Sequence, residues 1–139
     1  MATVLFLCVH NAGRSQMAEA IFNRLAKERG LAYTAESAGI ELADRIHPRV
    51  VEAMAEIGLD LSGKKPRQLT NQMVEQAERV VTMGCAVDSE ACPAVALREM
   101  EDWGLPDPKE MELAEVGAVR DTIHGNVEAL LRTFDLVAR

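Results

Sequence analysis

The segment VLFLCVHNAGRS, residues 4–15, joins an uninterrupted apolar run to a polar loop that contains a glycine. Apolar residues without polar alternation are typical of a strand that is buried on both faces of a parallel sheet. Beyond the loop, Ser15 can cap a helix whose apolar side chains, from Met17 to Ala26, share one face. A buried strand followed at once by an amphipathic helix predicts the first unit of a doubly wound α/β fold.

The rest of the chain continues this alternation. Further strands are expected over residues 32–37 and 80–83. Helices are expected to begin at Pro48 and after a cap at Thr70, and the clearest helical pattern covers residues 116–134. Strands and helices that alternate in this way predict a parallel sheet, with the ligand site at the carboxyl ends of its strands.

Length and composition limit the class of protein. The chain has 139 residues, of which 48% are hydrophobic, and it shows no repeat or linker, so we expect one catalytic domain over residues 1–139. The formal net charge of −7 argues against a nucleic-acid or anionic membrane partner. The first residues lack the cationic start of a secretory signal, and no stretch approaches the roughly 18 apolar residues of a membrane span. We therefore expect a cytoplasmic protein with no nucleic acid and no membrane among its partners.

The chain contains three cysteines, Cys8, Cys85 and Cys92. In the cytoplasm they should be reduced thiols, and their odd number fits no closed disulfide framework. No pair has the gap of two to four residues that is typical of a zinc site, so no metal and no cofactor are expected. Cys8 and Cys85 each follow an expected strand, which predicts that both lie at the ligand-binding edge of the sheet.

The loop between Cys8 and Arg14 has the composition of an anion cradle. Gly13 permits a positive φ or a close backbone approach, and Asn11 tolerates the left-handed region. Such a loop at a helix N-terminus directs successive backbone N–H groups toward one centre. The residues expected to bind an oxyanion in this way are Val9, His10, Asn11, Ala12, Gly13, Arg14 and Ser15.

Cys8 and Arg14 would make this cradle reactive. The planar guanidinium of Arg14 suits two oxygens of a tetrahedral oxyanion. The positive potential of the same loop favours the thiolate form of Cys8, and the Ser15 hydroxyl can donate a hydrogen bond to the sulfur. The loop lacks the Gly-Lys-Ser/Thr ending of a Walker loop. A nucleophile beside an oxyanion binder indicates catalysis rather than a structural thiol.

Three motifs are shared with a known superfamily. CVHNAGRSQMAEA, the later ESAG at residues 36–39, and the WG…DP segment that ends at Asp107 and Pro108 resemble the low-molecular-weight phosphotyrosine phosphatase superfamily, most closely its arsenate reductase branch. The resemblance implies an α/β fold with a four-stranded parallel sheet flanked by helices on both faces. It also implies that Cys8 is the nucleophile, Arg14 the oxyanion binder and Asp107 the general acid.

The resemblance further implies a relay through the segment GCAVDSEACP, residues 84–93. Cys8 would attack arsenate, Cys85 would attack the sulfur of Cys8 and release arsenite, and Cys92 would then attack Cys85. The final disulfide between Cys85 and Cys92 would pass to thioredoxin by thiol–disulfide exchange. Arsenate is then the substrate, and thioredoxin is the expected reductant.

Other functions remain open on the sequence. One is a reductase that uses mycothiol or another small thiol. That branch has the same sequence at His10 to Gly13, although its cysteines after the third strand are more closely spaced. Another is a protein tyrosine phosphatase, but Lys109 and Glu110 follow the Asp-Pro pair where that family has aromatic residues. A third is a non-catalytic oxyanion-binding or redox-sensing protein.

The arsenate reductase branch also often has a potassium site near its anion-binding loop. Asn11, Glu19 and Ser37 match that site, but Arg67 stands where the branch has an aspartate. A fixed cation would repel potassium, so this chain is expected to lack the site. The basic residues near Arg67 would instead attract the oxyanion or an acidic partner, or simply face solvent.

Overall fold

The computed structural model describes residues 2–84 and 100–138, so the expected roles of Cys85 and Cys92 lie outside the described residues. Its strands are β1 (Ala2–Leu7), β2 (Tyr33–Ala38), β3 (Arg79–Thr82) and β4 (Glu101–Asp102). They form one parallel sheet in the order β2-β1-β3-β4, as the resemblance implied. Leu7 pairs with both Ala38 and Thr82, so three strands end at one edge of the sheet, beside Cys8.

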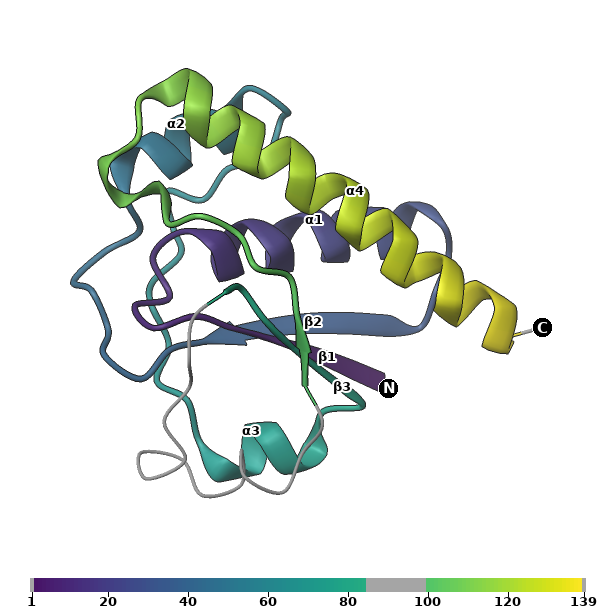
Figure 1. Ribbon diagram of the computed structural model, residues 1–139. Coiled ribbons are helices and arrows are strands. Elements are labelled where there is room, and N and C mark those ends of the chain that lie inside the picture. The colour runs from purple at the N-terminus through teal and green to yellow at the C-terminus, as the bar shows by residue number, and fades with distance from the viewer. Residues whose placement is uncertain (1, 85–99, 139) are drawn as a thin grey trace.

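Helices cover both faces of this sheet (Figure 1). They are α1 (Arg14–Glu28), α2 (Pro48–Ala55), α3 (Asn71–Gln76) and α4 (Leu113–Ala138), with a short 3₁₀ turn, η2 (Pro108–Glu110), before α4. Helices α1 and α4 lie together on one face, and α3 lies on the other (Figure 1). No helix in the described ranges is long and apolar enough to cross a membrane.

The central strand β1 is buried on both sides because its alternate residues enter two cores. Val4 and Phe6 pack in the cluster beneath α1 and α4, whereas Leu5 and Leu7 pack in the cluster beneath α3. These four side chains are fully or almost fully buried. Since burying one such side chain contributes about 1.5–3 kcal/mol, β1 is a firm base for the loop that follows it.

Two of the predicted helix N-termini are confirmed and one predicted helix cap is wrong. Pro48 is the first residue of α2, and the Thr70 hydroxyl caps α3 by accepting a hydrogen bond from the Met73 N–H at 3.2 Å. The expectation that Ser15 caps α1 is wrong, because α1 begins at Arg14 and its N-cap residue is Gly13. The Ser15 hydroxyl is used elsewhere, beside the sulfur of Cys8.

Candidate active site

The loop between β1 and α1 accepts backbone hydrogen bonds from the chain that follows β2. The carbonyl of Val9 accepts hydrogen bonds from the N–H groups of Ile40 and Glu41, both at 2.9 Å. The carbonyl of Ala12 accepts one from the N–H of His47, also at 2.9 Å. These carbonyls are thus occupied by the chain after β2, as expected for an anion cradle, in which the N–H groups of the loop are directed to its centre.

Two residues allow the loop its tight turn, and they do so in different ways. Asn11 takes the left-handed conformation, with φ at 51°, which Asn tolerates better than most residues. Gly13 has a negative φ and instead permits a close approach. A Cβ atom on Gly13 would lie 3.0 Å from Cγ of Pro108, so the glycine lets the loop that carries Asp107 pack against the cradle.

A directed chain of hydrogen bonds ends on the sulfur of Cys8. Oδ1 of Asn11 accepts from the backbone N–H of Arg67 at 2.8 Å and from Nε2 of Gln16 at 2.9 Å. Nδ2 of Asn11 therefore faces Ser15 and donates to its hydroxyl oxygen at 2.7 Å. That oxygen lies 2.8 Å from Sγ of Cys8, and either atom can be the donor in this contact. A thiolate at Cys8 has no hydrogen, so in that state the Ser15 hydroxyl would be the donor.

The side chain of Arg14 is only 8% exposed and is fixed by the chain segments that follow β3 and β4. Its Nη1 donates to the carbonyl oxygens of Met83 and Leu105, each at 2.8 Å. A guanidinium has five N–H donors, and the three on Nε and Nη2 have no hydrogen-bond acceptor among residues 2–84 and 100–138. Arg14 thus combines a fixed position with the donors that an oxyanion needs.

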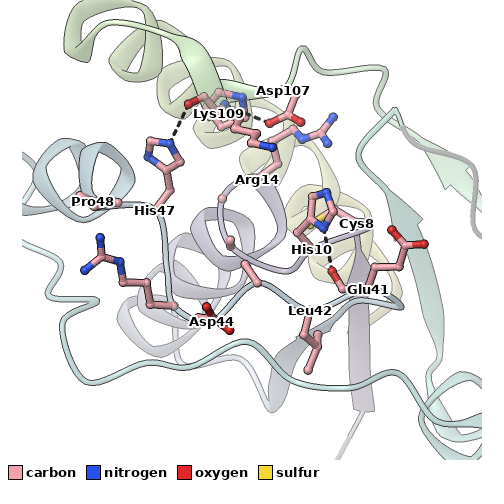
Figure 2. Close-up of a pocket in the computed structure, with 15 residues that line it drawn as sticks. Cys8, His10, Arg14, Glu41, Leu42, Asp44, His47, Pro48, Asp107 and Lys109 are labelled. Atoms are coloured by element: carbon pink, nitrogen blue, oxygen red, sulfur yellow. Dashed lines mark hydrogen bonds between the residues drawn. The ribbon is translucent and has the colours of Figure 1, made fainter.

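A pocket of about 650 Å³ opens above this loop. Figure 2 shows Arg14 and Asp107 at one side of the pocket, the chain around Leu42 and Asp44 at the other, and Cys8 between them beside His10. Asp107 lies just before η2 and accepts a hydrogen bond from the N–H of Lys109 at 3.0 Å. A thiol, a cation and a carboxyl group therefore line one pocket. These can serve as nucleophile, oxyanion binder and proton donor in a nucleophilic substitution at an oxyanion.

The residues expected to bind the oxyanion divide into two sets. His10, Ala12, Gly13 and Arg14 line the pocket with Cys8. Asn11 and Ser15 are completely buried behind the sulfur, and Val9 is partly exposed beside the loop. Nδ1 of His10 lies 2.7 Å from the carbonyl oxygen of Glu41, a contact that fixes this ring against the chain after β2.

Asp102, which the sequence did not single out, orders the end of β3. Its Oδ1 accepts from the N–H groups of Gly84 at 2.7 Å and Gly104 at 3.1 Å, and from the hydroxyl of Thr82 at 3.1 Å. The hydrogen bond from Gly104 is the largest cause that lowers the pKa of the Asp102 carboxyl, and the charge of Arg14 acts in the same direction. Gly84, at φ 90°, is the last described residue before Cys85.

Glu19 and Ser37, which match the potassium site of the arsenate reductase branch, lie beside two cationic side chains. Glu19 is 3% exposed and accepts a hydrogen bond from the Ser37 hydroxyl at 3.2 Å. Nζ of Lys64 lies 3.5 Å and Nη1 of Arg67 lies 3.8 Å from its carboxylate oxygens. In the part of the chain that the structure describes, no three or more His, Cys, Asp or Glu side chains are grouped so that they could hold a metal ion.

A family model, a sequence relative and two solved structures agree on the protein family that this chain resembles. Residues 3–137 match the model of the low molecular weight phosphotyrosine protein phosphatase family. An arsenate reductase of Staphylococcus xylosus is 35% identical over 127 residues, which are 91% of this chain and 93% of that protein. A solved arsenate reductase in its phosphate-binding state has a TM-score of 0.80 at 29% identity and covers 96% of this chain and 98% of its own. A thioredoxin-dependent arsenate reductase of Corynebacterium glutamicum has a TM-score of 0.74 at 33% identity, covering 99% of this chain and 63% of its own.

Proposed function

The chain belongs to the low molecular weight phosphotyrosine protein phosphatase family, and on that premise we propose that it reduces arsenate to arsenite with Cys8 as its nucleophile. The observation that carries the proposal is that Cys8, Arg14 and Asp107 all line one pocket. Arg14 and the N–H groups of the cradle would bind the arsenate oxygens. Ser15 would hold the sulfur of Cys8 as a thiolate, 2.8 Å from its own oxygen.

The first step forms a bond between Sγ of Cys8 and arsenic. As the sulfur attacks, one oxygen leaves as water, and Asp107 supplies a proton to it. Arsenic remains in the pentavalent state, bound to sulfur, because a thiolate has only replaced an oxygen ligand. The donors on Arg14 would stabilise the charge that gathers on the remaining oxygens.

The second step transfers two electrons to arsenic. The Cys85 thiolate would attack Sγ of Cys8, the sulfur–arsenic bond would break, and its electron pair would leave with arsenic as arsenite. Cys92 would then attack Cys85, which frees Cys8 as a thiolate and leaves a disulfide between Cys85 and Cys92. A dithiol of the thioredoxin class would reduce this disulfide and close the cycle. The thioredoxin-dependent relative from Corynebacterium glutamicum supports this choice of reductant.

Phosphotyrosine hydrolysis fits the pocket less well. The lining residues in the described part of the chain include no phenylalanine, tyrosine or tryptophan. A phosphotyrosine ring would therefore have no aromatic side chain to stack on, although stacking of this kind contributes to aromatic recognition. A small inorganic oxyanion needs only the cradle.

Arsenite production in defined thiol mixtures tests the proposal. With thioredoxin, thioredoxin reductase and NADPH, the wild-type protein should turn over, and Cys8→Ser should produce no arsenite. Cys92→Ser should release about one arsenite per enzyme and then stop, because its disulfide between Cys8 and Cys85 has no internal route to reduction. If Cys92→Ser turned over at the wild-type rate with a small thiol, the relay would be wrong and the small-thiol alternative would be right.

A further inference from the structure

His47 is hydrogen-bonded to the two loops that meet over the pocket. Its backbone N–H donates to the carbonyl of Ala12, in the loop that carries Cys8, at 2.9 Å. Its Nε2 lies 2.7 Å from the carbonyl oxygen of Lys109, as the dashed line in Figure 2 shows. The N–H of Lys109 in turn donates to Oδ1 of Asp107. One residue at the start of α2 therefore connects the thiol loop to the carboxyl loop.

The partners of the imidazole ring decide its tautomer. A carbonyl oxygen only accepts hydrogen bonds, so Nε2 of His47 carries the hydrogen and donates it to Lys109. Nδ1 is buried and has no hydrogen-bond partner among the described residues. The ring thus makes its polar contact to the Asp107 loop through Nε2. A side chain without a donor at that place would lose this link.

Two further contacts show that the start of α2 and the Asp107 loop are one packed unit. Nη1 of Arg49 donates to the carbonyl of Met111, and Nη2 lies 3.5 Å from the carboxylate of Glu112. Gly13, in the thiol loop, leaves room for Pro108, whose Cγ would be 3.0 Å from a Cβ at that position. These contacts hold the Asp107 loop near the cradle. His47 adds one hydrogen bond to the thiol loop, at Ala12, and one to the Asp107 loop, at Lys109.

We propose that His47 is a positioning residue, which sets the carboxyl group of Asp107 relative to the sulfur of Cys8. The inference rests on the role of Asp107 as general acid in the proposed function. A proton donor is useful only if it lies within hydrogen-bond reach of the leaving oxygen, so a small displacement of the loop lowers its effect. His47 itself touches neither the substrate nor the proton that is transferred.

The matched variants are His47→Gln and His47→Asn. Nε2 of a glutamine can take the place of Nε2 of histidine, whereas the shorter asparagine amide cannot reach Lys109. Both replacements are polar and leave the backbone bond to Ala12 intact. His124→Ala is the control, because His124 is a half-exposed residue of α4 that contacts Glu128. Melting temperature and the rate at which iodoacetamide alkylates Cys8 report on the fold and on the thiol loop.

The readout is kcat/KM for two aryl phosphates, weak alternative substrates that would use the same thiol, cation and acid as arsenate and that differ in how much they need an acid. A wild type that hydrolyses neither would overturn the proposal. Phenyl phosphate releases a strongly basic oxygen, and p-nitrophenyl phosphate a weakly basic one. Since general acids contribute about 10²–10⁴-fold, we expect His47→Asn to lower kcat/KM about tenfold for phenyl phosphate and about twofold or less for p-nitrophenyl phosphate. His47→Gln should recover most of the loss, and His124→Ala should equal the wild type.

A double-mutant cycle with Asp107→Asn decides whether His47 acts through Asp107. In the Asp107→Asn background, His47→Asn should cause no further loss, because the group that it positions is absent. Equal losses in both backgrounds, or a glutamine variant no better than the asparagine variant, would overturn the proposal. These hydrolysis rates require no reductant. A protein that hydrolyses aryl phosphates through Cys8 but forms no arsenite would refute the proposed function, and the same cycle would still measure the coupling between His47 and Asp107.

Discussion

The backbone N–H of Arg67 lies 2.8 Å from Oδ1 of Asn11, and this contact determines which atom of the Asn11 amide faces Ser15. With Oδ1 already occupied, Nδ2 donates to Ser15, whose hydroxyl hydrogen is then available to Cys8. The segment that carries Arg67 is itself held by the ion pairs of Lys64 and Arg67 with buried Glu19. The hydrogen-bond network around the thiol therefore includes a segment that is distant from it in the sequence.

Ser15→Ala removes the last hydrogen bond of this chain. We expect Cys8 to be alkylated by iodoacetamide about tenfold more slowly at pH 7, since a hydrogen bond to a charged group contributes about 1.5–3 kcal/mol. Ser62→Ala, at an exposed serine outside the site, should leave the rate unchanged. An unaltered alkylation rate in Ser15→Ala would show that the hydroxyl does not support the thiolate.

Glu19→Gln keeps the shape of the side chain and removes its charge. Lys64 and Arg67 are about half exposed, with side-chain exposures of 47% each. Their ion pairs are therefore partly screened, and we expect the free energy of unfolding to fall by about 1 kcal/mol. Urea denaturation measures the change, and the difference from wild type should shrink as salt is raised. Glu28→Gln, which breaks an exposed pair with Arg24, is the control and should have little effect. A difference that persists at high salt would contradict an electrostatic origin.

Asp102 predicts a dependence of stability on pH. Its carboxyl has a lowered pKa in the folded protein, so its charged form stabilises the fold at every pH above the unfolded value near 3.9. This contribution is lost as the pH falls through the lower, folded value. Asp102→Asn should therefore unfold more easily than wild type at pH 7, and the two melting temperatures should converge below about pH 4. Glu75→Gln, on the exposed side of α3, should show no such convergence. A constant offset between Asp102→Asn and wild type from pH 7 to pH 3 would contradict this role.

Gly125 offers a test of the fold that does not touch the site. It lies inside α4, and a Cβ atom at this position would meet no described atom within 4 Å apart from its chain neighbours and the backbone of its own helix. Alanine is favoured over glycine in a helix interior by about 1 kcal/mol, so Gly125→Ala should raise the free energy of unfolding by roughly that amount. Thermal unfolding measures the gain, and arsenate reduction should be unchanged. A loss of stability would show that α4 is not a regular helix there.

Local sequence signals were sufficient for the core of the fold and for the reactive residues of the pocket. The apolar run of β1, the glycine-containing loop and the cap at Thr70 are each contained in a few neighbouring residues. Cys8 and Arg14 were identified by residue type and spacing, Asp107 only through the family resemblance, and all three line one pocket of the structure. Their chemical roles remain predictions.

Other features depend on contacts that no local pattern encodes. Arg67 reaches Asn11 through its backbone across 56 positions, so the identity of its side chain gives no sign of the contact. His47 reaches Lys109 across 62 positions. Ser15 was expected to cap α1, because the preference of serine for caps is general, but its hydroxyl is next to Cys8. Strand β4 has only two residues, too few to produce a periodic pattern.

The transfer of oxidation from Cys8 to Cys85 and Cys92 is the central claim, and mass spectrometry of the arsenate-treated protein tests it most directly. After one equivalent of arsenate, proteolytic peptides of the wild type should contain a disulfide between Cys85 and Cys92, and those of Cys92→Ser a disulfide between Cys8 and Cys85. Arsenite release with neither disulfide formed would contradict the account.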